Sequence, residues 1–303
     1  MKIRSQFAAA CAASVVSASA MGAGTFSDFN LVVRGNLDST SEVEGRTAIG
    51  GNLSGTASNY GIRLTPPSSY LSVDSVIVGG NIGVQNMNVN AGNVRLGGTR
   101  SGNINMNGGG SVIADPAAGL AVSAFGSQMV STSSFLSGLA ATNTVSIPSS
   151  QPGPINFSAV AGSNGVAVFN VNGAAVFSNN RVQQMDLALN GASSVIINVS
   201  GTTINWTDGN FVGAFTSSFA RSRVLWNFHE ATSINLGGRA FNGALLAPAA
   251  SVSFQGVIEG SAWVNSMTQR GEVHRPEYVG FIPAPGASMA LAAAAGFAVR
   301  RRR

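Results

Sequence analysis

The chain has few of the side chains on which catalytic, redox and metal sites are built. It contains 1 cysteine and 2 histidines, and its single lysine is Lys2. Because Cys11 lies close to the N-terminus, the rest of the chain can form neither a disulfide nor a cysteine-ligated metal site. A Walker-type phosphate-binding loop requires a lysine after its glycines, so the absence of lysine beyond Lys2 excludes that class of nucleotide site.

Charge is sparse and unevenly placed. The chain has 17 basic and 12 acidic residues, and six of the basic ones lie at the two ends, as Lys2, Arg4 and Arg300 to Arg303. Between those ends, the chain has the remaining 11 basic residues and all 12 acidic residues, so the net charge of this region is −1 (11 − 12). A nucleic-acid-binding domain carries a basic patch or stripe, which this balance does not supply. We therefore expect no nucleic-acid partner.

The N-terminal residues have the layout of a secretory signal peptide. Two positive charges precede an apolar run from Phe7 to about Ala20, which closes with Ala18-Ser19-Ala20. A basic start, a short apolar core and an A-x-A cleavage pattern are the three parts of such a signal. We expect residues 1–20 to be removed during export.

The C-terminal residues have the layout of a sorting tail. Pro283 and Pro285 precede an apolar stretch, residues 287–299, and four arginines follow it: Arg300, Arg301, Arg302 and Arg303. At about 1.5 Å per residue, a helix of that stretch would cover about 20 Å of a hydrocarbon core that is about 30 Å thick. Terminal arginines of this kind stay on the cytoplasmic side. We therefore expect residues 283–303 to be a tail that contacts the inner membrane transiently.

The order of proline motif, short apolar helix and arginine cluster over residues 282–303 resembles the PEP-CTERM sorting signal. Ala284 stands where that signal has glutamate. The resemblance implies an exosortase-like processing enzyme as a partner and a second cut near residues 283–285. It also implies a Gram-negative-type bacterium, with the protein secreted or held at the cell surface or outer membrane.

Between the two ends, short β-branched runs bounded by glycine or asparagine recur. Six of them are expected strands: residues 31–33, 75–78, 93–96, 166–169, 195–199 and 224–226. The sequence Gly50-Gly51-Asn52 returns as Gly79-Gly80-Asn81 and, shortened, as Gly97-Gly98. Repeating strand-and-turn units of this size predict the stacked rungs of a β-solenoid. The spacing is uneven, 29 residues from Gly51 to Gly80 and 18 to Gly98, so a β-sandwich is the alternative.

One segment departs from the β pattern. Asp115-Pro116 has the composition of an N-cap followed by proline at the first helical position. Apolar residues then recur at roughly helical spacing, among them Leu120, Met129 and Leu136. We expect one or two helices over about residues 116–141, packed against a single mainly β domain that spans residues 21–282. Residues 142–160 are expected to be a connecting loop.

Candidate catalytic and metal-binding residues are few. No G-x-S-x-G sequence accompanies His229 or His274, so Ser-His-Asp catalysis is not expected. Glu42 and Glu44 lie two residues apart, which on a strand places both carboxylates on one face, roughly 6–7 Å apart. Such a pair is compatible with a calcium ion or an acid pair, but more often it is solvated or pairs with a nearby arginine such as Arg46. We expect no cofactor.

The central region resembles the choice-of-anchor A family of bacterial surface domains. The resemblance runs in order over about residues 28–270 and rests on six stretches: residues 29–33, 44–52, 195–201, 224–228, 243–248 and 256–260. Its motif residues are Glu44, Gly45, Arg46, Gly50, Gly51, Asn52, Trp226, Asn227, Phe228, Leu246, Ala247 and Pro248. The resemblance implies a β-helix-like adhesive domain joined to one of several C-terminal anchors, and it brings no catalytic residues.

Together these features predict a secreted, surface-sorted adhesive or extracellular-matrix module that is not an enzyme. Its partner would be an extracellular polysaccharide or a matrix protein, bound by long solenoid faces of Asn, Ser and Thr. Two alternatives are open. One is a β-solenoid enzyme that degrades polysaccharide with Glu42 and Glu44, and the other is an inert structural component of an outer layer.

Overall fold

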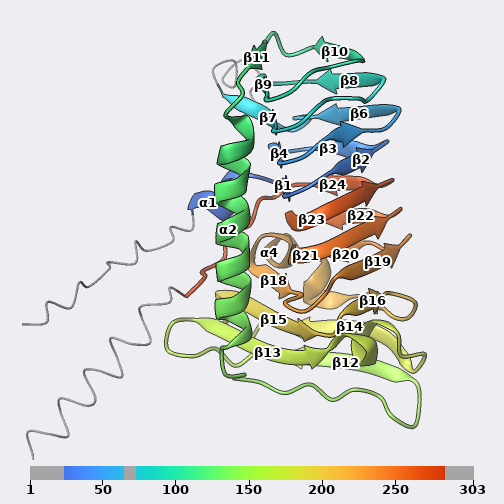
Figure 1. The fold of residues 1–303 in the computed structure, drawn as a ribbon. Helices are drawn as coiled ribbons and strands as arrows, with labels where there is room; N and C mark the ends of the chain where they lie inside the picture. Colours follow the sequence, from blue (N-terminus) through green and yellow to red (C-terminus); the bar gives the residue numbers. More distant parts are fainter. Residues whose placement is uncertain (1–23, 65–72, 284–303) are drawn as a thin grey trace, which may run out of the picture. The chain divides into compact units, whose positions relative to one another are not determined.

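The computed structural model describes residues 24–64 and 73–283, and its strands stack in parallel as the rungs of a β-solenoid (Figure 1). The mainly β architecture predicted from the glycine-bounded runs is confirmed, and each of the six expected runs lies within a strand. Among the described residues, no helix is both long and apolar enough to cross a membrane. The signal peptide and the apolar tail helix expected from the sequence fall outside the described residues.

The chain enters the stack near its middle and builds it in two halves. The first half ascends rung by rung from β1 to β10 and β11, and a long helix then runs along the side of the stack (Figure 1). The second half starts at the opposite end and proceeds until β23 pairs with β1 and β24 pairs with β3. The two halves therefore close against each other at the middle of the stack.

The first half contains α1 (Gly24–Asp28), β1 (Leu31–Val33), β2 (Leu37–Ser39), β3 (Glu42–Val43), β4 (Thr47–Ile49), β5 (Leu53–Ser54), β6 (Ala57–Tyr60), β7 (Asp74–Val78), β8 (Asn86–Val89), β9 (Asn93–Leu96), β10 (Asn103–Met106), β11 (Val112–Ala114) and α2 (Ala118–Ser137). The second half contains β12 (Gly153–Ser158), β13 (Val166–Asn172), α3 (Gly173–Phe177), β14 (Val182–Ala188), β15 (Ser194–Ser200), β16 (Thr203–Asn205), β17 (Asn210–Phe211), a 3-10 turn (Gly213–Thr216), α4 (Ser218–Arg223), β18 (Val224–Asn227), β19 (Ser233–Gly237), β20 (Phe241–Asn242), β21 (Ala244–Phe254), β22 (Val257–Glu259), β23 (Ala262–Gln269) and β24 (Glu272–His274).

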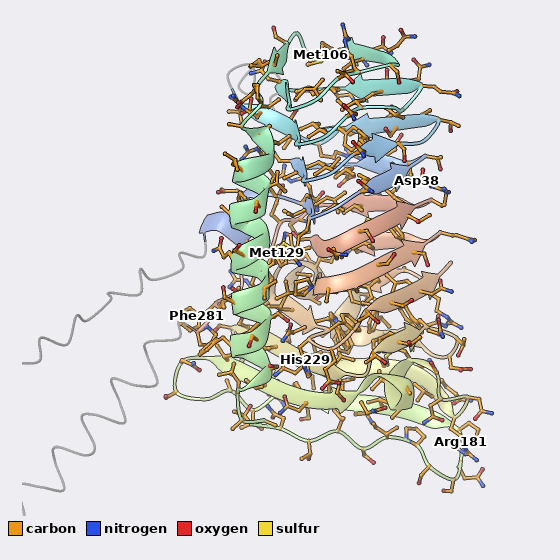
Figure 2. The ribbon with its side chains drawn as sticks, viewed as in Figure 1. Asp38, Met106, Met129, Arg181, His229 and Phe281 are labelled. Atoms are coloured by element: carbon orange, nitrogen blue, oxygen red, sulfur yellow. The ribbon has the colours of Figure 1, made fainter. Side chains whose placement is uncertain are left out.

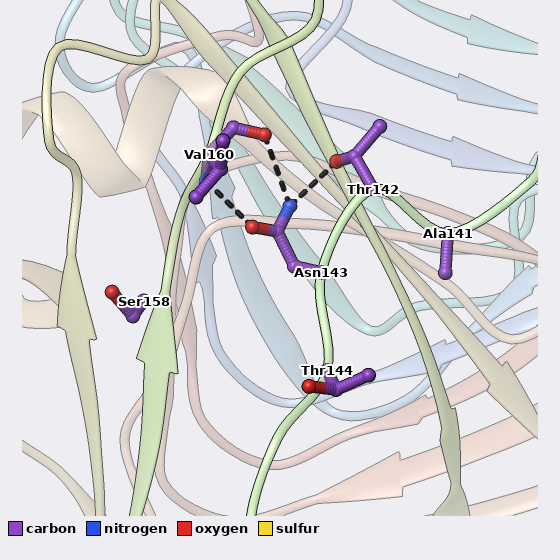
Figure 3. Close-up of a pocket in the computed structure, with 6 residues that line it drawn as sticks. All are labelled: Ala141, Thr142, Asn143, Thr144, Ser158 and Val160. Atoms are coloured by element: carbon purple, nitrogen blue, oxygen red, sulfur yellow. Dashed lines mark hydrogen bonds between the residues drawn. The ribbon is translucent and has the colours of Figure 1, made fainter.

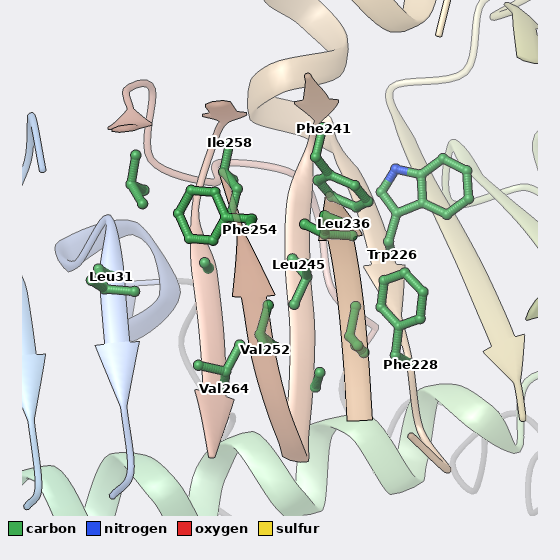
Figure 4. Packing of buried hydrophobic residues seen from close by; sticks show 14 of the residues in the cluster. Leu31, Trp226, Phe228, Leu236, Phe241, Leu245, Val252, Phe254, Ile258 and Val264 are labelled. Carbon is green, nitrogen blue, oxygen red and sulfur yellow. The ribbon is translucent and has the colours of Figure 1, made fainter. Parts of the chain in front are cut away.

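These strands form sheets that wrap around one apolar interior. The largest has the order β11-β9-β7-β4-β1-β23-β21-β18-β15-β13, and a second has the order β10-β8-β6-β3-β24-β22-β20. Inward-facing residues stack from rung to rung, as Val33, Ile49, Val78 and Leu96 do. In the second half the interior becomes aromatic around the fully buried Trp226, as Figure 4 shows for Phe228 and Phe241. Burial of these columns is the main source of stability in a chain without disulfides.

The turns at Gly50-Gly51, Gly79-Gly80 and Gly97-Gly98, which we call the glycine corners, allow neighbouring rungs to approach closely. The amide of Gly80 donates to the carbonyl of Gly51, and the amide of Gly98 donates to the carbonyl of Gly80. A Cβ atom on Gly80 would lie 2.6 Å from Asn52 Oδ1 and 2.7 Å from the Gly51 oxygen, which is too close for any other residue. The asparagine after each corner continues the stack, because Asn52 Oδ1 accepts a hydrogen bond from the Asn81 amide at 2.8 Å.

Two local predictions were wrong. The first concerns only the start of the helical segment: the segment is confirmed as a single helix, α2, but its N-cap is Ala117 and not Asp115. Asp115 instead accepts a hydrogen bond from the Ala117 amide and pairs with Arg95, so it ends the last rung before the helix begins. Residues 142–160 are not only a loop, because they contain β12, in which two buried side chains alternate with exposed ones.

The helix α2 covers the outer side of the largest sheet along residues that share an apolar face. Val122, Met129 and Leu136 are buried against side chains of the rungs below them. Two asparagines add polar anchors, since Asn227 Nδ2 donates to the Ser133 carbonyl and Asn198 Nδ2 donates to the Leu136 carbonyl, at 2.9 and 2.8 Å. These carbonyls belong to the last turns of α2, so the rungs satisfy part of its C-terminal end.

Candidate binding face

One side of the solenoid is a parallel sheet that no helix of the described residues covers. It is built from β16, β19, the second halves of β21 and β23, and then β2 and β5, each paired with the next. Its inward side chains form a buried apolar column: Ile204, Ile234, Val252, Met267, Leu37 and Leu53. Because side chains alternate along a strand, the residues on either side of that column point outward.

The outward side chains form two aligned columns that we call the hydroxyl–amide face. The first column is Thr203, Ser233, Ser251 and Ser266, and the second is Asn205, Asn235, Ser253 and Thr268. Five of these eight residues are exposed and three are half-buried. Neighbouring rungs of a sheet lie about 4.8 Å apart and alternate residues of a strand about 6.6 Å apart. The face is therefore a lattice of short hydrogen-bonding groups without a charge or an aromatic ring.

The second column continues onto the first half of the chain and stays nearly neutral. Asp38 follows Thr268 in register, and its Oδ2 atom lies 2.7 Å from Arg270 Nη2. Ser54 follows Asp38 on β5 and is exposed. The face thus extends across the junction between the two halves of the chain. Figure 2 shows Asp38 on the side of the stack away from α2.

A second side of the stack carries a ladder of side-chain amides that leads to a carboxylate. Asn105 Nδ2 donates to Asn88 Oδ1, Asn88 Nδ2 donates to Asn59 Oδ1, and Asn59 Nδ2 donates to Glu42 Oε1, at 2.9, 2.7 and 2.7 Å. All three amides are oriented in the same direction, with their donors toward Glu42. The Glu42 carboxylate therefore accepts the hydrogen bond of the last donor in the ladder, Asn59 Nδ2.

Glu44 is held differently from the expectation. Its Oε2 atom accepts a hydrogen bond from the Arg275 amide at 2.8 Å, and its Oε1 atom lies 3.3 Å from Arg63 Nε. The guanidinium of Arg46, the arginine suggested by the sequence, lies over the ring of Phe29 and donates to the Asp74 carbonyl. The sequence missed these partners because Arg63 and Arg275 are distant from Glu44 along the chain.

The two histidines lie at different places. His274 is on β24, with Nε2 2.6 Å from Glu272 Oε2 and Nδ1 3.3 Å from Glu259 Oε1. Burial alone would lower the pKa of His274, but the hydrogen bond to Glu272, the charges of Glu44 and Glu259 and the bond to Glu259 outweigh it and raise the pKa above 6.5. His229 lies toward the end of α2 and lines a shallow polar depression (Figure 2). Among the described residues, no three His, Cys, Asp or Glu side chains are grouped as a metal site requires.

The family-motif residues lie at structural junctions of the stack. Gly45 donates its amide to Asn30 at the junction of the two halves, and Gly50 and Gly51 form a corner whose asparagine is Asn52. Trp226 and Phe228 point into the interior, whereas Asn227 and Leu246 point toward α2. Ala247 is buried in the interior, and the Pro248 carbonyl accepts from Arg34 at 2.6 Å. Of the tail residues, only Pro283 falls within the described range.

The far end of the stack, below β12 and β13, is closed by residues 139–152. Figure 3 shows a shallow depression there, in which the Asn143 side chain links this segment to Val160. Asn143 Oδ1 accepts from the Val160 amide at 2.6 Å, and Asn143 Nδ2 donates to the Val160 carbonyl at 3.2 Å. These bonds identify the depression as part of the end cap.

Comparison with known proteins places the chain in a family. Residues 22–275 match the family described as "Putative Ice-binding-like adhesive domain". No curated protein matches the chain. Among solved structures, the chain is similar to an ice-binding protein from an Antarctic Biological Consortium, with 14% identity over 90% of this chain and 96% of that chain and a TM-score of 0.40. It is also similar to an ice-binding protein from the Antarctic ascomycete Antarctomyces psychrotrophicus, with 13% identity over 84% and 98% of the two chains and a TM-score of 0.36. Because the family match covers well over half of its length, the chain belongs to this ice-binding-like adhesive domain family.

Proposed function

We propose that the chain is an exported, non-enzymatic adhesive module that binds an extracellular polymer through the hydroxyl–amide face. The observation that carries this proposal is the pair of aligned Ser, Thr and Asn columns on a parallel sheet that no described helix covers. Membership of an adhesive domain family supports it.

The chemistry of the face favours a repeating ligand. One hydrogen bond to a protein group contributes only about 1 kcal/mol net, so a single sugar or peptide unit would bind weakly. A polymer that lies along the columns can engage groups on several rungs at once, and the contributions then add within one binding event. We therefore propose a polysaccharide chain as the ligand, with a matrix protein or an ice surface as the competing outcomes.

The alternative, a polysaccharide-degrading enzyme that uses Glu42 and Glu44, has less support. A glycoside hydrolase needs one carboxyl group as an acid and another as a base or nucleophile, facing the same substrate. Here Glu42 accepts from the Asn59 amide, and Glu44 is held by Arg63 and the Arg275 amide. Both carboxylates are thus engaged in hydrogen bonds with groups of the protein itself, which disfavours their use as a catalytic pair.

For its location, we propose export through the signal peptide and surface sorting through the tail. The basic-apolar-small order of residues 1–20 and the proline-apolar-arginine order of residues 283–303 support this route. An exosortase-like enzyme would remove the tail, in the manner of a choice-of-anchor A protein with a PEP-CTERM signal. Intact mass of the protein from its native cells tests the route, since a mass that includes residues 287–303 would contradict it.

A solid-phase panel tests the binding proposal. The folded full chain is applied to immobilised polysaccharides, to collagen and to growing ice crystals. We expect saturable binding to at least one polysaccharide. Because the two columns carry no charge and Asp38 beside them is paired with Arg270, binding should persist between about 0.1 and 1 M salt. Binding to collagen or ice alone would replace the polysaccharide as ligand. Absence of binding to every surface would favour the inert structural alternative.

A further inference from the structure

The two ends of the solenoid are finished differently. At one end, residues 139–152 pass beneath β13 and β12, and the Thr142 amide donates to the Val168 carbonyl (Figure 1). At the other end, β10 and β11 are each the last strand of their sheet, with no further strand of the described chain beside them. Solenoids normally protect both ends, because an unpaired edge offers backbone groups to another strand.

The open end also exposes apolar surface that is buried one rung below. Ile104 and Met106 are half-buried, whereas Met87 and Val89, their register partners on β8, are fully buried. Edge strands usually carry charges that discourage pairing, but residues 101–114 contain no charged side chain. Met106 is labelled at this end in Figure 2.

From these features we propose that β10 is a homodimer interface, at which the open ends of two copies pair antiparallel around a twofold axis at Asn105. The sequence Asn103-Ile104-Asn105-Met106-Asn107 has the same order of amide and apolar residues in both directions. Antiparallel pairing about Asn105 therefore sets Ile104 opposite Met106 of the second copy and Asn103 opposite Asn107. A self-complementary patch of this kind is what a twofold interface requires.

The backbone directions agree with that register. The Asn103 amide donates to the Gln85 carbonyl on the neighbouring rung, so Asn103 and Asn105 direct their backbone groups toward β8. Ile104 and Met106 alternate with them, and their N–H groups face the open edge. Around a twofold axis at Asn105 these two residues form the hydrogen-bonded pairs, and the two Asn105 residues form a non-hydrogen-bonded pair with close side chains.

The Asn105 side chain is suited to that position. Its Nδ2 atom donates to Asn88, and Asn105 is the last residue of the amide ladder. The Oδ1 atoms of the other two asparagines, Asn88 and Asn59, each accept from the next rung. Each Asn105 Nδ2 has a second hydrogen, beyond the one donated to Asn88, so Asn105 Oδ1 is placed to accept from the side-chain Nδ2 of Asn105 in the second copy. The inference concerns the end of the stack and does not depend on what the hydroxyl–amide face binds.

Sedimentation velocity of the full chain tests the interface. We expect a species of about twice the chain mass that dissociates on dilution. Asn105→Lys should give the monomer, because it places like charges across the twofold axis, whereas Asn86→Lys, an equally exposed change one rung below, should leave the dimer intact. Circular dichroism of each variant confirms that it is folded. A wild-type monomer at every concentration, or equal behaviour of the two lysine variants, would overturn the proposal.

A crosslink tests the register without weakening the interface. In a Cys11→Ser background, Asn105→Cys brings two sulfurs together, since the twofold-related Cα atoms would lie about 4.5–5.5 Å apart. Asn103→Cys is the matched control, because residue 103 of the second copy would lie four residue steps away along the strand, at least about 13 Å. We expect disulfide-linked dimers from Asn105→Cys only. Crosslinking of Asn103→Cys to the same extent would show that the strands do not pair about Asn105.

Discussion

Asn30 and Gly260, 230 residues apart in the sequence, are joined by a hydrogen bond of 2.9 Å from Asn30 Nδ2 to the Gly260 carbonyl. The same amide donates to the His274 carbonyl, and Asn30 Oδ1 accepts from the Gly45 amide at 3.0 Å. One buried side chain therefore connects the first rung of the chain to the last rung. This junction also carries the hydroxyl–amide face from one half of the chain to the other.

Asn30→Ala should lower the free energy of unfolding by about 2–4 kcal/mol. The side chain is fully buried, so its loss leaves the Gly45 amide and two carbonyls without this hydrogen-bond partner in the protein interior. Denaturant unfolding followed by tryptophan fluorescence measures the change. Asn36→Ala is the control, because Asn36 is exposed and accepts one hydrogen bond, from the Asn52 amide. A loss of about 1 kcal/mol or less is expected there, and equal losses would argue against a special role for the junction.

Stability should decrease as the pH rises through the pKa of His274. That pKa is raised in the folded protein, so protonation favours the folded state. The stabilisation is fully present below the unfolded value of 6.5 and is lost as the pH rises through the higher folded value. Midpoints of denaturant unfolding between about pH 6 and 8 measure it. His274→Gln should remove this dependence and His229→Gln should retain it, whereas retention in His274→Gln would contradict the assignment.

Gly80→Ala should destabilise the fold by about 1–3 kcal/mol, because the new methyl group would overlap the neighbouring corner at Gly51 and Asn52. Gly238→Ala provides the matched change at a glycine with no atom within 4 Å of the new Cβ. That substitution should be neutral or slightly stabilising. Thermal unfolding of both variants distinguishes close stacking of the corners from a general intolerance of glycine substitution.

Asn227→Ala should loosen the C-terminal half of α2. Asn227 is fully buried, donates to the Ser133 carbonyl and to Asn198, and accepts from Ser133 Oγ at 2.6 Å. We expect a loss of about 2–4 kcal/mol and faster amide hydrogen exchange in the last turns of the helix. Asn170→Ala, at the exposed end of the same ladder, should cost less. Unchanged exchange in the Asn227 variant would show that apolar packing alone holds the helix.

Local patterns predicted the solenoid because its rungs are short, β-branched and bounded by glycine. The corners at Gly51, Gly80 and Gly98 are readable from the sequence because close stacking admits only glycine there. The helix was located to within a few residues for the same reason, since its apolar spacing is local. Its start was misplaced because Asp115 is held by Arg95, a partner 20 residues away.

The order of the rungs was not predictable from the sequence. The pairing of β1 with β23 depends on contacts such as Asn30 with Gly260, which no local pattern encodes. The hydroxyl–amide face was foreseen only as a kind of surface, because its residues come from strands of both halves whose register is set by stacking. Strand β12 was overlooked because Gly153 and Pro154 open it, and both residues normally indicate a turn.

The most direct measurement of the central claim is the affinity of two serine variants for the polysaccharide that binds most tightly in the panel. Ser251→Arg places a long charged side chain in the middle of the hydroxyl–amide face, and Ser134→Arg makes the same change at an exposed position of α2. We predict that the dissociation constant rises at least about tenfold for Ser251→Arg, equivalent to about 1.4 kcal/mol, and less than about twofold for Ser134→Arg. Equal affinities of both folded variants and the wild type would contradict the claim that this face binds the polymer.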